Sequence, residues 1–188
     1  NICKFFIKKN HNLVIVDNLP KKFFSKRLAE HSIINKKHTI LYKKIDLTKT
    51  FQIKNLFQQL KKKLSSIDIL INCAGIQHVS SVENFSDEMW EKIISINLSS
   101  SFYTSKYALP LMKKNKWGRI INIVSIHGHV ASVNKSGYVA SKHGMIGLTK
   151  TIALETATLP ITCNAISPGW VDTPLVSKQI NQRVKKNK

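Results

Sequence analysis

Short apolar runs that alternate with helical patterns are the feature of this 188-residue sequence that most restricts its fold. Continuously apolar runs of this length are typical of parallel strands that are buried on both faces. Strands are expected at 13–17, 39–45, 67–72, 118–125 and 161–167. Helices are expected over 50–64 and 87–114, and a further helix carries Tyr138 and Lys142 and ends near residue 156. This alternation predicts an α/β fold with a doubly wound parallel sheet in three αβα layers. We expect a single domain over residues 1–188.

Two residues are expected to begin helices as N-caps. Thr48 and Ser86 each precede a helical pattern with a side-chain oxygen that can accept from a first-turn N–H group. The second pattern begins with Asp87 and Glu88, which suit the positive end of a helix. Helical patterns are also expected at the N-terminus, around 23–31 and from Leu175.

Composition excludes several classes of protein. Hydrophobic content of 43% and charged content of 21% are typical of a soluble globular chain. No apolar run approaches the ~20 residues of a membrane span, and the start has no signal-peptide pattern. Cys3, Cys73 and Cys163 are far apart and lack metal-ligand spacing, so we expect reduced cysteines, no metal and a cytoplasmic protein.

The net charge of +20 raises the question of a nucleic-acid partner. Of the 30 cationic residues, 27 are Lys and only 3 are Arg, and they accompany 15 Asn and 24 Ile. That bias is typical of a coding preference spread over surface positions, whereas base-reading proteins depend on bidentate Arg. We therefore expect no specific nucleic-acid binding, only weak association with polyanions at low salt.

Polar residues follow the ends of the predicted strands. In open α/β sheets, ligands bind beyond the carboxyl ends of the strands. Asp17 is placed to accept hydrogen bonds from a ribose diol, and Asn72-Cys-Ala-Gly75 lets backbone approach a ligand closely. An ordinary strand-end acid and a tight turn are the alternatives. The residues expected at this crevice are Asp17, Asp46, Asn72, Ser125 and Pro168-Gly169.

The stretch from Ser125 to Lys142 carries groups suited to proton transfer. Tyr138 and Lys142 are four residues apart, so a helix places them on one face. An ammonium beside a phenol favours the phenolate, and such a Tyr can exchange a proton with a reacting oxygen. Taken alone, the pair also fits an amphipathic helix with a half-buried Tyr and a solvated Lys.

In this order, the motifs resemble the short-chain dehydrogenase/reductase family from roughly Leu13 to Gln179. The matching elements are Asp17, Asp46, Asn72-Cys-Ala-Gly75, Asn97, Ser125, Tyr138-x-x-x-Lys142 and Pro168-Gly169. The resemblance implies a Rossmann-like NAD-binding domain. It also implies Tyr138 as the acid/base, Lys142 as its partner and a ribose contact, Ser125 orienting the substrate oxygen and Asn97 holding a relay water.

Within that family the sequence most resembles the bacterial-type D-3-hydroxybutyrate dehydrogenases. The segments that carry this likeness are 75–78, 125–128, 130–136, 142–144 and 164–180. The resemblance implies NAD-dependent oxidation of (R)-3-hydroxybutyrate to acetoacetate. It implies a substrate site of Gln77, Ser125, His127, Lys135, Tyr138 and Gln179. Charge-assisted hydrogen bonds suit such a small carboxylate.

The cofactor implied by the resemblance is NAD. The residues expected around it are Asp17, Asp46, Asn72, Ala74, Gly75, Tyr138, Lys142, Pro168, Gly169, Val171 and Thr173. Asp17 would repel a 2′-phosphate, which favours NAD over NADP. The family commonly forms homotetramers through its long helices, here about 87–114 and 137–156.

The sequence departs from the family pattern at both ends. The family begins with a strand and a Gly-rich turn that holds the pyrophosphate, but the first glycine here is Gly75. The family's later helices and last strand are also not matched. We therefore expect a fold truncated at both ends, with an intact chemical centre, no competent cofactor site, and unpaired strand edges beside the missing central strand.

Three other functions remain open from the sequence. One is a short-chain dehydrogenase that acts on another alcohol or on an acyl-carrier thioester. Another is a non-catalytic basic protein that binds polyanions. The third is a structural remnant that assembles with full-length subunits.

Overall fold

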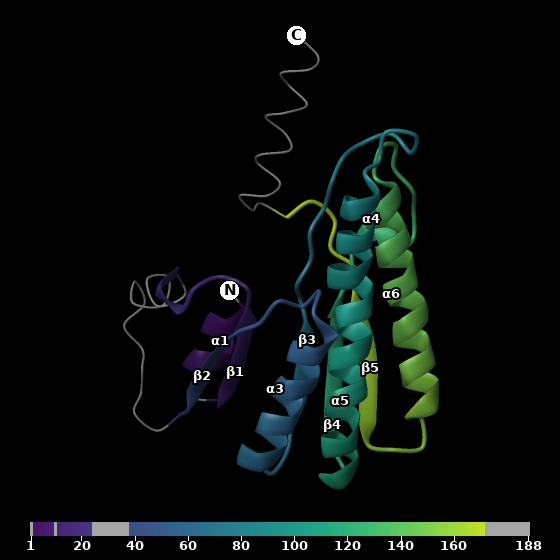
Figure 1. The fold of residues 1–188 in the computed structure, drawn as a ribbon. Coiled ribbons are helices and arrows are strands. Elements are labelled where there is room, and N and C mark those ends of the chain that lie inside the picture. The colour runs from purple at the N-terminus through teal and green to yellow at the C-terminus, as the bar shows by residue number, and fades with distance from the viewer. Residues whose placement is uncertain (1, 10, 24–37, 172–188) are drawn as a thin grey trace. The chain divides into compact units, whose positions relative to one another are not determined.

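The computed structural model describes residues 2–9, 11–23 and 38–171 (Figure 1). The chain divides into two compact units, residues 1–62 and 63–188. Each unit is an α/β arrangement with parallel strands, as the sequence predicts. None of the described helices is long and apolar enough to cross a bilayer.

The first unit contains a two-stranded parallel sheet and two described helices. Its elements are α1 (Ile2–Lys8), β1 (Leu13–Asp17), β2 (Ile40–Lys44) and α3 (Thr50–Lys63), which ends at the boundary between the units. Strand β1 pairs with β2 from Leu13 opposite Ile40 to Asp17 opposite Lys44. The strands predicted at 13–17 and 39–45 are confirmed, the second one residue shorter at each end.

Helix α3 buries the apolar stripe that its spacing predicts, through Ile53, Leu56, Phe57 and Leu60. Phe51, an apolar residue in the first turn of α3, is 62% exposed. The expected Thr48 cap is wrong, because α3 begins at Thr50 and its first backbone bond runs from Ile53 N to the Lys49 carbonyl. The Thr48 hydroxyl instead donates to Asp46 Oδ1 at 2.8 Å. The local polar contacts thus tighten the turn between β2 and α3.

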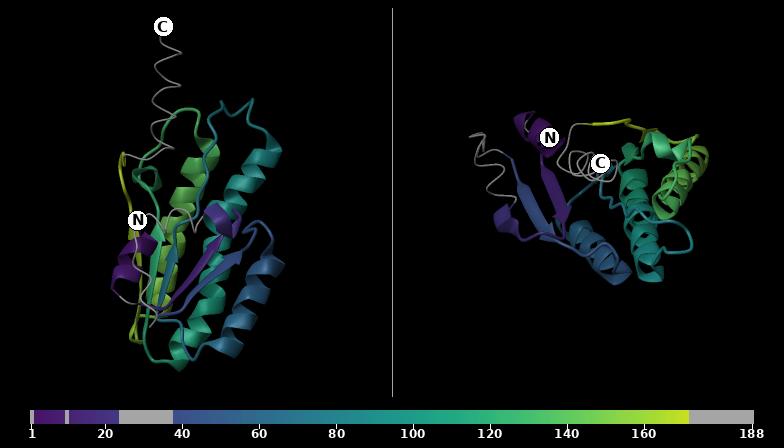
Figure 2. Two further views of the ribbon diagram at one scale, coloured as in Figure 1. Left: turned by 90° about the vertical axis from the view of Figure 1, so that its left-hand side faces the viewer. Right: turned by 90° about the horizontal axis from the view of Figure 1, so that it is seen from above.

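The second unit contains a three-stranded parallel sheet in the order β3-β4-β5. Its strands are β3 (Ile69–Asn72), β4 (Gly118–Ile123) and β5 (Ile161–Ile166). Its helices are α4 (Asp87–Ile94), a π-helical segment (Ser95–Ser99), α5 (Ser100–Lys114), a 3₁₀ turn (Ile126–Gly128) and α6 (Ser136–Glu155). Figure 2 gives two further views of these elements.

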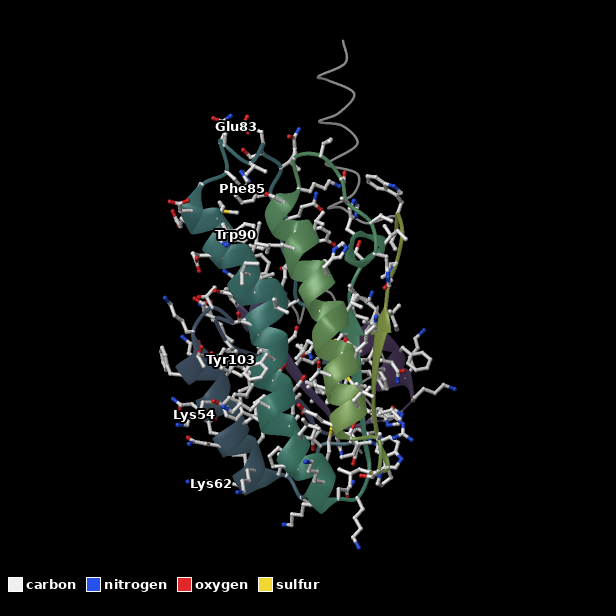
Figure 3. All side chains as sticks on the ribbon, turned by 90° about the vertical axis from the view of Figure 1, so that its right-hand side faces the viewer. Lys54, Lys62, Glu83, Phe85, Trp90 and Tyr103 are labelled. Carbon is white, nitrogen blue, oxygen red and sulfur yellow. The ribbon has the colours of Figure 1, made fainter. Side chains whose placement is uncertain are left out.

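Helices α4, α5 and α6 lie on one face of this sheet, as Figures 1 and 3 show. Along β4 the residues facing them, Gly118, Ile120 and Asn122, are buried, and the alternate residues are only half-buried. Strand β5 alternates in the same way, with Thr162 and Asn164 exposed. The prediction of strands buried on both faces is therefore wrong for β4 and β5 within this unit, where the described helices cover one face.

Strands β1 and β3 each lie at the edge of their own sheet among the described residues. These are the two strands between which the resemblance places a further, central strand. Among the described residues, no strand pairs with the free edge of β1 or of β3.

Ser86 caps α4, as predicted, because its side chain accepts from Met89 N at 3.2 Å. Replacing Ser86 by Ala removes this acceptor, so we expect the free energy of unfolding to fall by about 1 kcal/mol. Urea unfolding of the two proteins measures the difference. Ser65→Ala, at an exposed position in the same unit, is the matched control, and an equal loss in both variants would contradict the capping role.

Candidate active site

Helix α6 carries the predicted pair Tyr138 and Lys142 on one face. The Lys142 ammonium lies over the phenol ring, 5.7 Å from its centroid. The helix begins at Ser136, after Asn134 turns the backbone with a positive φ of 61°. The helical pair that the spacing predicts is therefore formed.

Lys142 is buried, with only 4% of its side chain exposed. Its Nζ donates to the Ile123 carbonyl at 2.8 Å and lies 3.6 Å from Met145 Sδ. Burial lowers the pKa of Lys142 from 10.5 to about 8, and the nearby Cys73 thiol opposes this shift slightly. The side chain is not the solvated Lys of an ordinary amphipathic helix.

The 3₁₀ turn that follows β4 brings His127 to Tyr138, and Ser125 caps the beginning of this turn. Ser125 Oγ accepts from His127 N at 3.2 Å and lies 3.4 Å from His127 Nδ1. The His127 ring centroid is 5.9 Å from that of Tyr138. Ser125 thus caps this turn and also places its hydroxyl beside the imidazole.

Asn97 lies in the π-helical segment between α4 and α5 and is fully buried. Its Oδ1 accepts from Ile76 N at 2.9 Å, and its Nδ2 donates to Ile76 O at 3.0 Å and to Ser141 Oγ at 3.0 Å. Ser141 in turn donates to the Tyr138 carbonyl at 2.8 Å. The Asn97 side chain therefore fixes the loop after β3 to the helix of Tyr138.

The residues predicted for a carboxylate lie near this centre. Lys135 directly precedes α6, is 4% exposed, and places its Nζ 5.6 Å from the Trp170 ring centroid. The loop that carries Gln77 runs alongside, because Ser80 N donates to the Asn134 carbonyl at 2.9 Å. Lys135 is therefore a buried side chain and not a solvated loop charge.

Phe85 and Trp90 support the beginning of α6 (Figure 3). Their rings meet edge to face with centroids 6.4 Å apart. A Cβ on Gly137 would lie 3.3 Å from Phe85 and 3.5 Å from Trp90. The missing side chain at Gly137 therefore lets α6 start close against these rings, next to Tyr138.

A Ser, a His, a Tyr and a Lys thus meet beyond the carboxyl end of a parallel strand. The short-chain dehydrogenase family model matches residues 1–184. The chain belongs to the short-chain dehydrogenase family. Its Rossmann-like architecture agrees with solved structures of similar proteins.

Two curated relatives are D-beta-hydroxybutyrate dehydrogenases. That of Cupriavidus necator is 52% identical over 145 residues, which are 77% of this chain and 56% of the relative. That of Rhizobium meliloti is 53% identical over 142 residues, 76% of this chain and 55% of the relative. The matched segments thus span little more than half the length of these relatives.

Two solved structures show the same fold. A 4-hydroxyisoleucine dehydrogenase complexed with NADH is 34% identical with a TM-score of 0.78, covering 96% of this chain and 74% of that one. ElxO with NADP bound is 28% identical with a TM-score of 0.86, covering 97% of this chain and 73% of that one.

Asn72 of this short-chain dehydrogenase is predicted to border the cofactor, and the structure shows that its side chain forms hydrogen bonds inside the unit. Its side chain is buried, donates to Asn122 Oδ1 at 2.8 Å and accepts from Thr104 Oγ1 at 2.7 Å. Ala74 and Gly75, which follow it, are exposed. A Cβ on Gly75 would lie 3.7 Å from Lys142 Nζ, so this backbone borders the centre.

The other predicted cofactor residues fall in three groups. Pro168 lies beside the centre, since its carbonyl accepts from Ile126 N at 2.9 Å, and Gly169 and Val171 follow in the same segment. Asp17 and Asp46 belong to the other unit, where their carboxylates accept from Leu19 N and Thr48 N. Thr173 and Gln179 lie outside the described residues.

Sequence reasoning missed Asn122, Thr149, Ser141 and Trp170. Asn122 stands inside the apolar run Ile-Ile-Asn-Ile-Val, and this interruption of a buried strand was a visible signal. Ser141 and Thr149 look like ordinary helix residues until α6 is packed against its neighbours. Among the described residues, no three His, Cys, Asp or Glu side chains gather closely enough to hold a metal.

Proposed function

We propose that this chain carries the catalytic centre of an NAD-dependent dehydrogenase that oxidises (R)-3-hydroxybutyrate to acetoacetate. The convergence of Ser125, His127 and Tyr138 above the buried Lys142 supports the proposal most directly. Ser125 would orient the substrate hydroxyl, and Tyr138 would accept its proton. The names of the two bacterial relatives support this substrate.

The residues around the centre fit a nicotinamide cofactor in part. NAD⁺, when bound, supplies the hydride acceptor. The exposed backbone of Ala74 and Gly75 would lie along it, Lys142 would contact its ribose, and Asp17 favours NAD over NADP. The Gly-rich phosphate turn of the family is not found in this sequence.

Isothermal titration with NAD⁺ tests the expectation that these 188 residues lack a competent cofactor site. We expect no measurable heat at micromolar NAD⁺, because the pyrophosphate would lack its anion site. Micromolar binding would overturn that expectation. Turnover is best measured in a chain extended at both ends with the corresponding segments of the Cupriavidus necator relative, called the extended chain below.

The substrate carboxylate is proposed to lie among His127, Lys135 and Gln77, with Gln179 completing the set. Lys135 is 4% exposed at the start of α6, where its ammonium would give the substrate carboxylate a charge-assisted hydrogen bond. A short hydroxy acid buries little apolar surface, so such a charge would supply much of its affinity.

Replacing Lys135 by Met should raise KM for 3-hydroxybutyrate about 100-fold in the extended chain and change kcat much less. Losing a charge-assisted contact costs roughly 1.5–3 kcal/mol of binding free energy. A contact that is equally strong in the substrate complex and in the transition state affects KM and leaves kcat unchanged. Lys150→Met, an exposed position on α6, is the control. An unchanged KM in Lys135→Met would remove the substrate assignment.

An acyl-carrier reductase is the second candidate. A 3-oxoacyl-[acyl-carrier-protein] reductase of Buchnera aphidicola is 42% identical over 137 residues. That function would not need the buried Lys135, so the same KM measurement discriminates the two.

The remaining assignments accompany this proposal. We propose a homotetramer of the full-length form through the long helices, where Phe102 and Leu154 are 44% and 78% exposed. We propose a cytoplasmic protein without a specific nucleic-acid partner, in which the charge of +20 reflects surface lysines. A salt titration of DNA binding tests the last point, since weak, sequence-blind association is expected.

A further inference from the structure

Asn72 and Asn122 stand directly opposite each other on β3 and β4, both buried beneath the helices. Their side-chain amides belong to a series of hydrogen bonds in which each group donates to the next. Thr104 Oγ1 donates to Asn72 Oδ1 at 2.7 Å, Asn72 Nδ2 to Asn122 Oδ1 at 2.8 Å, and Asn122 Nδ2 to Thr149 Oγ1 at 2.8 Å. The series ends where Thr149 Oγ1 donates to the Met145 carbonyl at 2.7 Å.

This series of hydrogen bonds ends on the face of α6 that carries Lys142. Residues 142, 145 and 149 are spaced by three and four, so they share that face. On the strand, Asn122 directly precedes Ile123, whose carbonyl accepts from Lys142 Nζ at 2.8 Å. The bond from Asn122 to Thr149 therefore joins the same strand and helix that hold Lys142.

Buried side-chain amides at these positions require hydrogen-bond partners. An unsatisfied polar group in a core is destabilising, whereas two apolar residues of similar shape need no partner. A leucine would let α6 slide or tilt on β4, because apolar packing is non-directional. The 2.8 Å hydrogen bond from Asn122 to Thr149 can form in only one register of α6 on β4, because its distance and angle are restricted.

We propose that Asn122 and Thr149 form a positioning pair that fixes Lys142 against β4. The role in catalysis rests on the proposed function, but the position of Lys142 does not. Neither residue touches Tyr138 or the substrate site in any described hydrogen bond. They act through the strand and the helix, by holding the Ile123 carbonyl and the Lys142 stem in register.

Replacing Thr149 by Val keeps the shape but removes the acceptor of the Asn122 amide. We expect α6 to loosen on β4 and water to reach Lys142, so that its pKa rises by about one unit. The pKa is measured by NMR of the chain labelled at lysine Cε, with Lys142→Met assigning the signal. Cys73 and Tyr138, the titratable groups described around Lys142, are unchanged by this substitution.

Thr149→Ser restores the hydroxyl and is the matched control, in which the pKa of Lys142 should return to that of the unmodified chain. Lower stability alone would not move this pKa in a folded variant. A folded Thr149→Val with an unchanged pKa would overturn the proposal, and so would a serine variant that behaves like valine.

A measurement on the unmodified chain applies if the valine variant does not fold. The side-chain amide signal of Asn122 should shift with pH at the midpoint of the Lys142 titration, because the two groups share one strand and one helix. An amide signal that is constant through that titration would contradict the proposal. In the extended chain, Thr149→Val should lower kcat while Thr149→Ser does not. Loss of the activity effect with the NMR effect intact would count against the proposed function only.

Discussion

Replacing Tyr138 by Phe should lower kcat for 3-hydroxybutyrate oxidation about 1,000-fold in the extended chain. The substitution keeps the ring that packs 5.9 Å from His127 but removes the only group placed to take the hydroxyl proton in this proposal. A positioned acid/base contributes typically 10²–10⁴-fold to a rate. KM should change little, since the substrate carboxylate is bound elsewhere. Initial rates of NADH formation measure both constants.

Tyr103→Phe is the matched control for Tyr138→Phe. It removes a phenol from α5 in the same unit, on the face shown in Figure 3, and we expect kcat within about twofold of the unmodified protein. Two results would contradict the assignment of Tyr138. One is a Tyr138→Phe variant with nearly full turnover, and the other is an equal loss in the Tyr103 control.

Most of the fold followed from local patterns. The strands β1 to β5 and the helices α3 to α6 were predicted to within a few residues, because their apolar spacing is decided by nearby residues. The Ser86 cap was predicted for the same reason. The Thr48 cap was not, since the competing bond to Asp46 depends on how the turn after β2 closes.

The candidate centre was predictable where residue spacing determines contact. Tyr138 and Lys142 are one helical turn apart, and Ser125 and His127 share one turn after β4. The tasks of Asn72 and Asn97 were not predictable in this way. Their partners, Asn122 and Ser141, are 50 and 44 residues away, so only the packed fold shows them.

Replacing Lys142 by Met should stabilise the fold by about 2 kcal/mol at pH 7. Burial lowers the pKa of Lys142 from 10.5 to about 8. At 1.36 kcal/mol per unit, the charged form costs the folded state about 3 kcal/mol below pH 8. Losing the hydrogen bond to the Ile123 carbonyl offsets about 1 kcal/mol of the gain.

The free energy of unfolding should depend on pH, because the pKa of Lys142 differs between the folded and unfolded chain. Between pH 8 and 10.5 the unfolded chain binds more protons at Lys142 than the folded chain, so stability rises with pH over that window. Cys163 acts in the opposite direction, because burial raises its pKa from 9.0 to about 11 and stability falls as pH rises from 9 to 11. Cys163→Ala is therefore the background for both proteins.

Urea unfolding from pH 7 to 10.5 in that background separates the two charge states of Lys142. The advantage of the Met variant should be largest at pH 7 and should shrink steadily above pH 8, as the native lysine loses its proton. A constant difference across this range would show that Lys142 is not held as a buried ammonium. A costly buried charge, fixed by the Ile123 carbonyl and lying over the Tyr138 ring, is expected where that charge serves the chemistry of the site.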